Sequence, residues 1–419
     1  MTDDFGVGDY DTPTGHIVPA PMDCMSCGVC LGNCPTYLLS QDEKEGPRQR
    51  IRTLSKLVVE KSEVDDEAIV HLNNCIQCRA CELVCPSQMN YSELFDKAQY
   101  KLLDQQDKGF YAKLALDWVA DKKKLKSLMP LLLFYKLSGV QWLFRKLGLL
   151  KLLKLHIAEK LARLPELKPL KSSYPTNTQV KGKVALFTGC IAEHFDRKTL
   201  DASIKVLNAL GYEVSIPVRQ VCCGAIHYHN GEPEAAKELM QQNRSGFNHQ
   251  EFEAIIYCVT GCGSQLQEYQ LVLELDDNDS AFTAPLFEVS DFILGHWDDT
   301  LSINPLSAKV AVHEPCSQRN VLKTQQAVYD LLGKIPELKV EALEENNICC
   351  GAGGSYMLSH PHTAQTLRDN KWQHIFNSGA DYVVTSNIGC DMHLQTFEFK
   401  NHPVEFKHPV TILADQLYT

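Results

Sequence analysis

Two runs of cysteines with the same spacing stand near the start of the 419-residue chain. Each run has three cysteines that are two residues apart, a fourth cysteine after three more residues, and then a proline. The cysteines are Cys24, Cys27, Cys30 and Cys34 in the first run and Cys75, Cys78, Cys81 and Cys85 in the second. Three thiolates on such a short loop can each reach a different iron of one cubane cluster. The two runs therefore predict two [4Fe–4S] clusters.

The fourth cysteine of each run is expected to ligate the other cluster, as the same run does in two-cluster ferredoxins. One cluster is then held by Cys24, Cys27, Cys30 and Cys85. The other cluster is held by Cys75, Cys78, Cys81 and Cys34. Zinc is the alternative metal, because CxxC pairs also form tetrahedral zinc sites. The repeated run with its proline favours iron over zinc. We therefore expect a helical ferredoxin-type domain over residues 15–100.

A second set of cysteines occurs twice in the C-terminal half of the chain, at offsets of 126 to 128 residues. Each copy carries an adjacent cysteine pair that is followed by Gly-Ala. The candidate ligands are Cys190, Cys222, Cys223, Cys258 and Cys262 in the first copy and Cys316, Cys349, Cys350 and Cys390 in the second. Ser386 stands in the second copy where the first has Cys258. Convergent thiolates suit a further iron–sulfur cluster in each copy, with zinc as the runner-up. Small buried core cysteines are the remaining interpretation, and the near-constant offset argues against it.

Four histidines lie close in sequence to the duplicated cysteines, namely His227, His229, His313 and His393. A histidine beside a metal site can tune it or carry protons, although most such residues are structural. The sequence has no G-x-G-x-x-G fingerprint after a strand, no HExxH and no recognisable Ser/His/Asp signature. We therefore expect no flavin, nicotinamide or catalytic site on this chain.

The C-terminal region alternates short apolar runs with helical patterns. We expect strands in KVALFTGC, YEVSIP, EAIIYC, KVAVHEPC and DYVVTS, and helices over residues 199–210, 233–243 and 363–378. Such alternation predicts α/β units with largely parallel sheets. The fold class is therefore a multidomain mixture of α+β and α/β. We expect the ferredoxin-type domain to be followed by a helical segment at 101–180 and two similar repeats at 181–300 and 301–419.

The helical middle segment is basic and apolar. Between Lys122 and Arg163 there are eleven Lys and Arg residues and a single acid, Glu159, although the whole chain has a formal net charge of −11. An apolar face at helical spacing is predicted for Leu133, Leu137, Val140, Phe144 and Leu147. A basic amphipathic helix of this kind can lie in the headgroup plane of an anionic membrane. The alternative is a helix that packs on the protein's own core.

The amino-acid composition further restricts the class of protein to which this chain can belong. The acidic net charge makes nucleic acid an unexpected partner. Seventeen cysteines in tight groups are typical of metal sites in a reducing compartment and not of a secreted disulfide framework. The N-terminus lacks the basic and apolar regions of a signal peptide, and no run of about 18 apolar residues occurs. We expect a cytoplasmic protein that is peripheral on the inner face of the cell membrane.

Several segments around the cysteines resemble the iron–sulfur subunits of glycolate oxidase. They are CGVCLGNCPTY at 27–37, CIQCRACELVCPS at 75–87, CCGAIHYH at 222–229, CCGAGGSYMLSHP at 349–361 and NIGCDMHL at 387–394. The resemblance implies an electron-transfer subunit of a respiratory, FAD-linked 2-hydroxy-acid dehydrogenase of the glycolate or D-lactate type. It would accept electrons from a separate FAD-containing subunit and pass them toward membrane quinone or a quinone-linked subunit.

Similar architecture also serves glycerol-3-phosphate dehydrogenase and heterodisulfide reductase, which are the alternatives. A self-contained disulfide reductase would need the full set of five cysteines in its repeats, and Ser386 counts against it. A structural scaffold whose repeats hold zinc is the third hypothesis.

Overall fold

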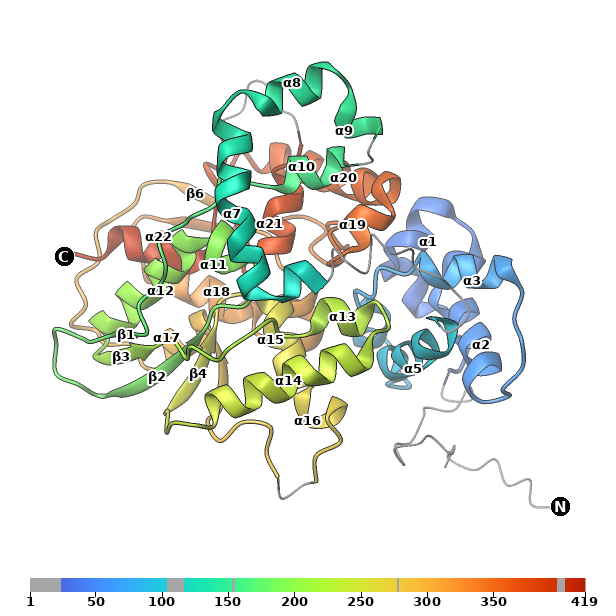
Figure 1. The fold of residues 1–419 in the computed structure, drawn as a ribbon, viewed down its shortest axis with the longest axis horizontal. Coiled ribbons are helices and arrows are strands. Elements are labelled where there is room, and N and C mark those ends of the chain that lie inside the picture. Colours follow the sequence, from blue (N-terminus) through green and yellow to red (C-terminus); the bar gives the residue numbers. More distant parts are fainter. Residues whose placement is uncertain (1–23, 104–116, 153–154, 277–278, 398–403, 419) are drawn as a thin grey trace.

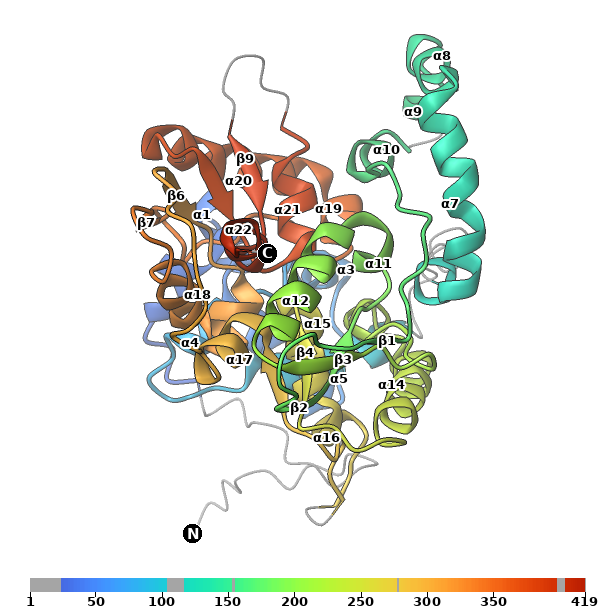
Figure 2. The ribbon, with the colours of Figure 1, turned by 90° about the vertical axis from the view of Figure 1, so that its left-hand side faces the viewer.

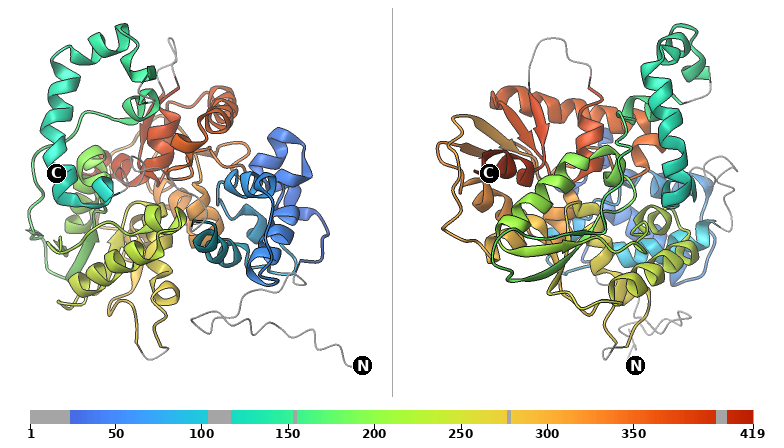
Figure 3. Two further views of the ribbon diagram at one scale, coloured as in Figure 1. Left: turned by 45° about the vertical axis from the view of Figure 1, so that its right-hand side comes forward. Right: turned by 60° about the vertical axis from the view of Figure 1, so that its left-hand side comes forward.

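The computed structural model describes residues 24–103, 117–152, 155–276, 279–397 and 404–418. Three kinds of structure follow one another along the chain: a small helical part, a helical arm and two α/β units (Figure 1). The helical part gathers at one side of the α/β units, and the arm projects from another (Figure 3).

The N-terminal helical part carries the first eight cysteines. Its helices are α1 (Pro35–Ser40), α2 (Pro47–Val58), α3 (Asp66–Asn73), α4 (Ala80–Leu83) and α5 (Tyr91–Leu103), with 3-10 turns η2 (Val29–Asn33) and η3 (Glu43–Glu45). α1 begins at the proline that follows Cys34, because proline suits the first turn of a helix. The Asp65 side chain caps α3 by accepting from the Ala68 amide at 2.7 Å. Leu54, Leu72 and Leu94 form the centre of its core.

The first α/β unit has a five-stranded sheet in the order β1-β3-β2-β4-β5. The strands are β1 (Ser173–Tyr174), β2 (Gly182–Phe187), β3 (Tyr212–Ser215), β4 (Ala254–Tyr257) and β5 (Leu286–Glu288), and all pairs except β1–β3 are parallel. Its helices are α11 (Ala192–Phe195), α12 (Arg197–Ala209), α13 (Ala225–His229), α14 (Pro233–Phe247), α15 (Thr260–Gln267), α16 (Tyr269–Val272) and α17 (Val289–Gly295).

The second α/β unit has a parallel four-stranded sheet in the order β7-β6-β8-β9. The strands are β6 (Lys309–Val312), β7 (Lys339–Ala342), β8 (Tyr382–Val384) and β9 (Glu405–Lys407). Its helices are the π-helical turn η4 (Ser317–Leu322), α18 (Gln325–Leu332), α19 (Tyr356–Ser359), α20 (Pro361–Ser378), α21 (Ile388–Leu394) and α22 (Pro409–Gln416). All five predicted strands and three predicted helices are confirmed. The sequence patterns missed β1, β5, β7 and β9, which are only two to four residues long.

The two α/β units share one hydrophobic core. Leu200 and Val206 of α12 pack in the same cluster as Ile412 and Leu413 of α22. The opposite face of the first sheet packs separately, so Ile255 belongs to a different cluster from its neighbour Ile256. This alternation is the period of two that a β-strand imposes on its side chains.

The arm consists of α7 (Lys122–Leu137), α8 (Val140–Lys146), α9 (Leu149–Leu152) and α10 (His156–Leu161). Figure 2 shows α7 and α8 standing away from both sheets. Glu159, the single acid between Lys122 and Arg163, is buried. It links α7, α8 and α10 through ion pairs. Its carboxylate accepts from Arg145 of α8 at 2.9 Å and lies 3.4 Å from the Lys136 ammonium of α7. No helix in the described ranges is long and apolar enough to cross a membrane.

Candidate iron–sulfur centres

The two N-terminal cysteine runs fold into loops of the same shape. In the first run Ser26 and Gly28 adopt left-handed backbone conformations, with φ of 53° and 83°. Gln77 and Arg79 occupy the corresponding positions of the second run, both with φ of 57°. Left-handed conformations are unfavourable for non-glycine residues, so the surrounding structure must hold them. They turn the backbone sharply between the cysteines of each run.

The first group of thiols draws on both runs. Cys24, Cys27 and Cys30 line one hollow together with Cys81 and Cys85 of the second run. Burial raises the pKa of Cys30 to about 11, and the neighbouring Cys24 thiol adds to this effect. Cys27 is exposed, so this group lies at the protein surface.

The second group brings Cys34 beside the remaining thiols of the second run. Burial raises the pKa of Cys81 well above its ordinary value, and the nearby Cys78, Cys75 and Cys34 thiols raise it further. The Cys75 sulfur accepts from the Gln77 amide at 3.4 Å and from the Tyr91 hydroxyl at 3.5 Å. Such donors stabilise a thiolate in a buried site. The exchange of the fourth cysteines that the sequence predicts is thus compatible with both groups.

A buried arginine accompanies the second group. The Arg50 Nη1 lies 3.9 Å from the Cys34 sulfur, and its Nη2 lies 2.6 Å from a carboxylate oxygen of Glu45. The Arg50 side chain is only 2% exposed. Sequence reasoning missed this residue, because nothing in the sequence of residues 46–52 distinguishes Arg50 from the exposed Arg52.

In the first α/β repeat four thiols form a continuous group. The Cys190 and Cys222 thiols hydrogen-bond to each other, and this contact raises the pKa of Cys190 and lowers that of Cys222. The Cys223 thiol in turn contacts those of Cys222 and Cys262. Gly224, which follows the cysteine pair, has φ of 87° and starts α13. A left-handed conformation there is easiest for glycine, which explains the Gly after the pair.

Cys258 does not join this group, and the expectation of five convergent thiols in the first repeat is corrected to four. Its sulfur lies 3.1 Å from the Ser203 hydroxyl of α12, within the core shared by the two units. Cys190 and Cys222 pack on the other face of the sheet. The reason is the phase of β4, because Cys258 continues the face of Ala254 and Ile256.

The second repeat carries an equivalent group with one addition. Thiol contacts join Cys316 to Cys349, Cys349 to Cys350, and Cys350 to Cys390. The imidazole of His313 lies with the Cys350 and Cys390 sulfurs, all three ligand atoms being within 4.8 Å of one another. Burial lowers the pKa of His313 to about 3, so its ring is neutral.

The second ferredoxin group meets the second repeat directly. The Cys78 thiol lies near those of Cys316 and Cys349. Burial and the nearby Cys316 raise the pKa of Cys78, and Cys78 in turn raises the pKa of Cys349. Cys78, Cys316 and Cys349 share one cluster of apolar contacts. The Asn320 amide donates to the Cys78 carbonyl at 2.7 Å and holds η4 against the cysteine loop. These contacts join residues that are more than 200 positions apart.

The two repeats also meet near their cysteine groups. The Ser317 hydroxyl, next to Cys316, donates to the Thr260 hydroxyl at 2.9 Å. Asn387 donates to the same Ser317 oxygen at 3.2 Å. Thr260 and Asn387 stand close to Cys262 and Cys390 in sequence, so this contact lies between the two thiol groups.

The other histidines noted in the sequence have different surroundings. The His393 Nε2 lies 3.0 Å from the Ala364 carbonyl, which is a structural hydrogen bond. The exposed His229 lies 3.9 Å from Asp96, in the N-terminal helical part. The buried His227 has its Nε2 3.6 Å from Asp117 and 3.8 Å from Glu232. Of the four, His313 is the one whose imidazole lies against the cysteines of its repeat.

The predicted apolar face of the middle segment is corrected. A single helix does not run through it, because α7 ends at Leu137 and Gly139 turns the chain with φ of 82°. Leu137 and Leu147 are exposed as expected, whereas Leu133, Val140 and Phe144 are half-buried within the arm. The large exposed apolar side chains of the arm are Leu131, Phe134, Leu137, Trp142, Leu143, Leu147, Leu152 and Leu155.

Lys122 also behaves differently from the lysines that follow it. Its ammonium lies 2.9 Å from the Thr188 hydroxyl and 3.0 Å from the Glu193 carboxylate. Its charge lowers the pKa of Cys190, although contact with Cys222 and burial raise that pKa more strongly. These contacts hold the base of the arm beside the thiols of the first repeat. In contrast, Lys123, Lys124 and Lys126 are exposed.

The donor sets fit iron–sulfur clusters. Each of the four groups offers four soft thiol ligands, and the pKa shifts are those of crowded buried thiols without their metal. Backbone amides and hydroxyls already point at several sulfurs, and such donors tune the potentials of bound clusters.

Comparison with protein-family models agrees with this division of the chain. The 4Fe-4S dicluster domain matches residues 22–89. The cysteine-rich CCG domain matches twice, at residues 184–267 and 310–395. The linker region of the glycolate oxidase iron-sulfur subunit matches residues 108–162, which include the arm up to the end of α10.

Curated relatives extend the match over most of the chain. The probable glycolate oxidase iron-sulfur subunit of Bacillus subtilis (strain 168) is 31% identical over 389 residues, which are 88% of this chain and 87% of that protein. The glycolate oxidase iron-sulfur subunit of Escherichia coli (strain K12) is 30% identical and covers 88% and 89%. Lactate utilization protein A of Bacillus cytotoxicus is 29% identical over half of this chain and 88% of its own length. Together with the cysteine groups, these matches show that the chain belongs to the family of glycolate oxidase iron–sulfur subunits.

Proposed function

We propose that this chain carries electrons from the FAD-containing subunit of a 2-hydroxy-acid dehydrogenase, of the glycolate or D-lactate type, toward quinone in the membrane. The observation that carries the proposal is the contact of Cys78 with Cys316 and Cys349. It joins the ferredoxin part to the repeats through sulfur ligands, which a scaffold would not need. The names of the relatives support the choice of hydroxy acid.

Sixteen of the seventeen cysteines are proposed as ligands. Cys24, Cys27, Cys30 and Cys85 would hold the first [4Fe–4S] cluster, and Cys75, Cys78, Cys81 and Cys34 the second. Cys190, Cys222, Cys223 and Cys262 would hold a cluster in the first repeat, and Cys316, Cys349, Cys350 and Cys390 one in the second. The bound clusters supply one-electron steps, and the chain supplies their spacing, their burial and the donors to their sulfurs.

The first centre is proposed as the place where electrons enter. Cys27 is exposed there, and Met25 and Val29 on the same loop expose 72% and 53% of their surface. Large exposed apolar side chains beside a redox centre suit a partner protein. We infer that the flavin subunit docks here, and that electrons then pass to the second centre and into the second repeat.

The arm is proposed as the part that contacts the membrane. Leu131, Phe134 and Leu137 of α7 are more than 60% exposed, and so is Trp142 of α8. Exposed lysines lie near the base of the same arm. Apolar side chains that are flanked by lysines suit an anionic bilayer surface. The chain would then be peripheral on the inner face of the cell membrane.

A self-contained disulfide reductase is disfavoured as the alternative. That chemistry relies on five cysteines in a repeat, and neither repeat brings five thiols together: Cys258 packs in the shared core and Ser386 replaces it in the second repeat. A glycerol-3-phosphate dehydrogenase subunit would differ in its flavin partner. A donor screen on the complex that co-purifies with this chain separates these substrates.

The route is tested with Cys316→Ser in the full chain, purified anaerobically with its flavin partner. Wild-type protein should hold about eight irons in its two ferredoxin centres and further iron in the repeats. In the variant, the hydroxy acid should still reduce the ferredoxin centres, as followed by EPR, while electron transfer to a short-chain quinone is lost. Cys258→Ser is the matched control, with both steps unchanged. Zinc in place of iron in the repeats, or full quinone reduction by Cys316→Ser, contradicts the proposal.

The membrane contact is tested separately with vesicles that contain anionic lipid. Leu131→Ser combined with Phe134→Ser should weaken co-sedimentation, and Leu271→Ser, an exposed leucine of α16, should leave it unchanged. Added salt should release part of the wild-type protein, because the Debye length falls to about 8 Å at 0.15 M ionic strength. Equal binding by all variants would show that the arm docks on protein.

A further inference from the structure

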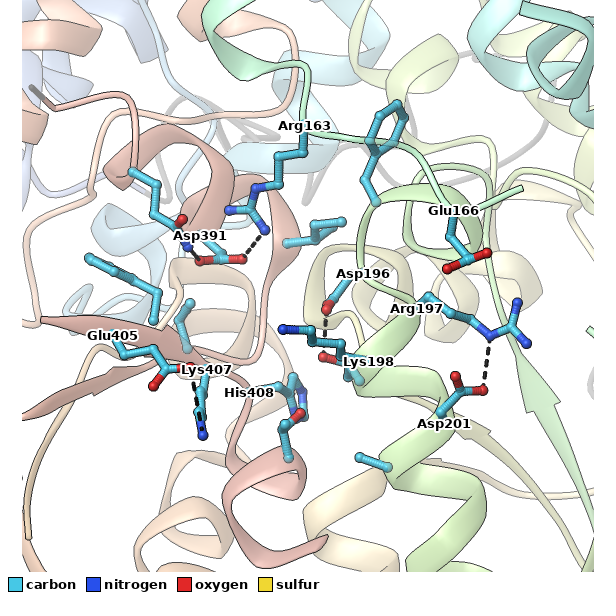
Figure 4. Close-up of a pocket in the computed structure, with 18 of the residues that line it drawn as sticks. Arg163, Glu166, Asp196, Arg197, Lys198, Asp201, Asp391, Glu405, Lys407 and His408 are labelled. Atoms are coloured by element: carbon cyan, nitrogen blue, oxygen red, sulfur yellow. Dashed lines mark hydrogen bonds and ion pairs between the residues drawn. The ribbon is translucent and has the colours of Figure 1, made fainter. Parts of the chain in front are cut away.

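A cavity of about 1230 Å³ lies where the two α/β units and the arm meet. Its walls come from α11 and α12 of the first unit and from β9, α21 and α22 of the second. Residues 163–166, which directly follow the arm, close one side (Figure 4). Its volume exceeds the range of about 300 to 1,000 Å³ that is typical of small-molecule sites, which are common at interfaces between structural units.

The charges in the walls are largely paired with one another. Arg163 lies 2.7 Å from Asp391, Arg197 2.9 Å from Asp201, and Lys407 2.8 Å from Asp415. Figure 4 shows the first two of these ion pairs facing the cavity from different units. Paired cations have little attraction left for a carboxylate or phosphate group. Two donors of the walls are still available to a ligand oxygen: the exposed Lys198 has no ion pair with another described residue, and the Arg163 Nη2 is buried without a hydrogen-bond partner (Figure 4).

Aromatic side chains make one wall flat and apolar. The Trp372 ring stacks on that of Phe397 at 4.9 Å with an interplanar angle of 21°, and the Phe406 ring lies 5.7 Å away. Phe195 contributes from the first unit. Aromatic rings bind other planar rings in stacked or edge-to-face geometry. The walls thus suit a planar ring that carries hydrogen-bond acceptors.

The position of the cavity connects the redox centres with the arm. Asp391 in its wall directly follows Cys390, a thiol of the second repeat. On the opposite side, Leu164 lies three residues after the end of α10 and is 60% exposed. The cavity thus lies between the segment that follows the arm and a helix of the second repeat that carries a candidate ligand thiol.

A proton donor stands in the same wall. One oxygen of Asp196, Oδ1, accepts from the Thr199 hydroxyl at 2.7 Å, which leaves Oδ2 to hold a proton. Burial raises the pKa of this carboxyl to about 7, and the nearby Asp391 carboxylate also raises it. Arg163 acts in the opposite direction with a smaller effect. At neutral pH the carboxyl is protonated in a large fraction of molecules.

We propose that this cavity binds the ring of a quinone and that Asp196 donates a proton to it. The inference rests on the proposed function, since it names the place where the electrons leave. Reduction adds two electrons and two protons, so that each C=O of the quinone becomes C–OH. The electrons arrive one at a time from the second repeat. One proton comes from the Asp196 carboxyl, which is then protonated again from water, and the other comes from water directly.

Binding and proton transfer are tested with the full, cluster-loaded chain and a benzoquinone that carries one isoprene unit. Ala202 of α12 lines the cavity, and Ala202→Phe should raise the dissociation constant at least tenfold in equilibrium dialysis. Asp196→Asn keeps the shape of the side chain, so the constant should change less than threefold. Its reduced centres should, however, be reoxidised by the quinone about 100-fold more slowly, within the range for loss of a general acid. Asp299→Asn, an exposed site away from the cavity, is the matched control.

Two further measurements keep the outcomes distinct. Iron content and reoxidation by ferricyanide, which needs no proton, should be unchanged in every variant and so report on folding. The inference is overturned if Ala202→Phe binds the quinone as tightly as wild type, or if Asp196→Asn is reoxidised at the wild-type rate. Failure of the hydroxy acid and flavin subunit to reduce the wild-type centres would instead overturn the proposed function, whatever the dialysis result.

Discussion

Replacing Arg50 should lower the reduction potential of the second centre and leave the first nearly unchanged. The guanidinium is buried and lies 3.9 Å from the Cys34 sulfur. A reduced cluster carries one more negative charge than an oxidised one, so a fixed cation stabilises the reduced form. Arg50→Gln removes this cation but keeps a hydrogen-bond donor at the same place.

The size of the shift follows from Coulomb's law. The centre of a cluster lies about 3 Å beyond its ligand sulfur, so the charges are separated by about 7 Å, and at an effective dielectric constant of about 20 they interact by about 2.4 kcal/mol. This energy corresponds to about 100 mV for a one-electron couple. Glu45 then loses Arg50 but keeps His71 and Asn74 as partners, and rearrangement of these groups offsets part of the change. We therefore expect a fall of about 50 to 100 mV.

The assay is a redox titration of the anaerobic protein, followed by EPR so that the two ferredoxin centres are read separately. Arg50→Lys preserves the charge and should shift the potential by less than half as much. Arg52→Gln removes an exposed charge from the same helix and should have little effect, because water screens it. A rise in potential, or an equal fall in both centres, would refute the assignment of Cys34 to the second group.

Other predictions concern the repeats and the shared core. Cys258→Ser should keep the wild-type iron content, whereas Cys223→Ser should lower it, as measured by metal analysis. His313→Asn should change the EPR signal and potential of the second repeat's centre while the ferredoxin signals stay as they are, because its ring lies against that repeat's thiols. Burial lowers the pKa of His408 to about 4, below its ordinary 6.5. As the pH falls below 6.5, the unfolded chain therefore binds a proton at His408 that the native state does not bind. This costs about 2 kcal/mol of stability at pH 5, and His408→Gln should reduce the drop in thermal midpoint between pH 7 and pH 5, whereas the exposed His249→Gln should not.

The iron–sulfur character of this protein could be predicted because it depends on the local spacing of the cysteines. Two residues between cysteines and a proline after the fourth are properties of one short loop. The duplication at offsets of 126 to 128 residues was likewise visible without any structure, as were the longer parallel strands. In these cases the physical determinants lie within a few residues of each other along the chain.

The face that Cys258 takes could not be predicted in the same way. Both faces of a central parallel strand are buried, so AIIYC at 254–258 is apolar throughout and lacks the alternation that would have assigned the side chain. The arm was misjudged for a related reason. Hydrophobic periodicity continues across Gly139, but the left-handed turn at that residue separates α7 from α8 and changes which apolar side chains face outward.

The proximity of the cysteine groups to one another was decided by tertiary structure alone. Cys78 and Cys316 come together only when the ferredoxin part packs against η4, and Arg50 becomes a buried neighbour of Cys34 only when α2 folds over the first loop. The cavity beside Asp196 is likewise formed by the packing of α12 against α22. The sequence thus determined which cysteines are candidate ligands, since their spacing is local. Packing between distant segments decides which of these cysteines become neighbours. A local sequence pattern does not contain that information.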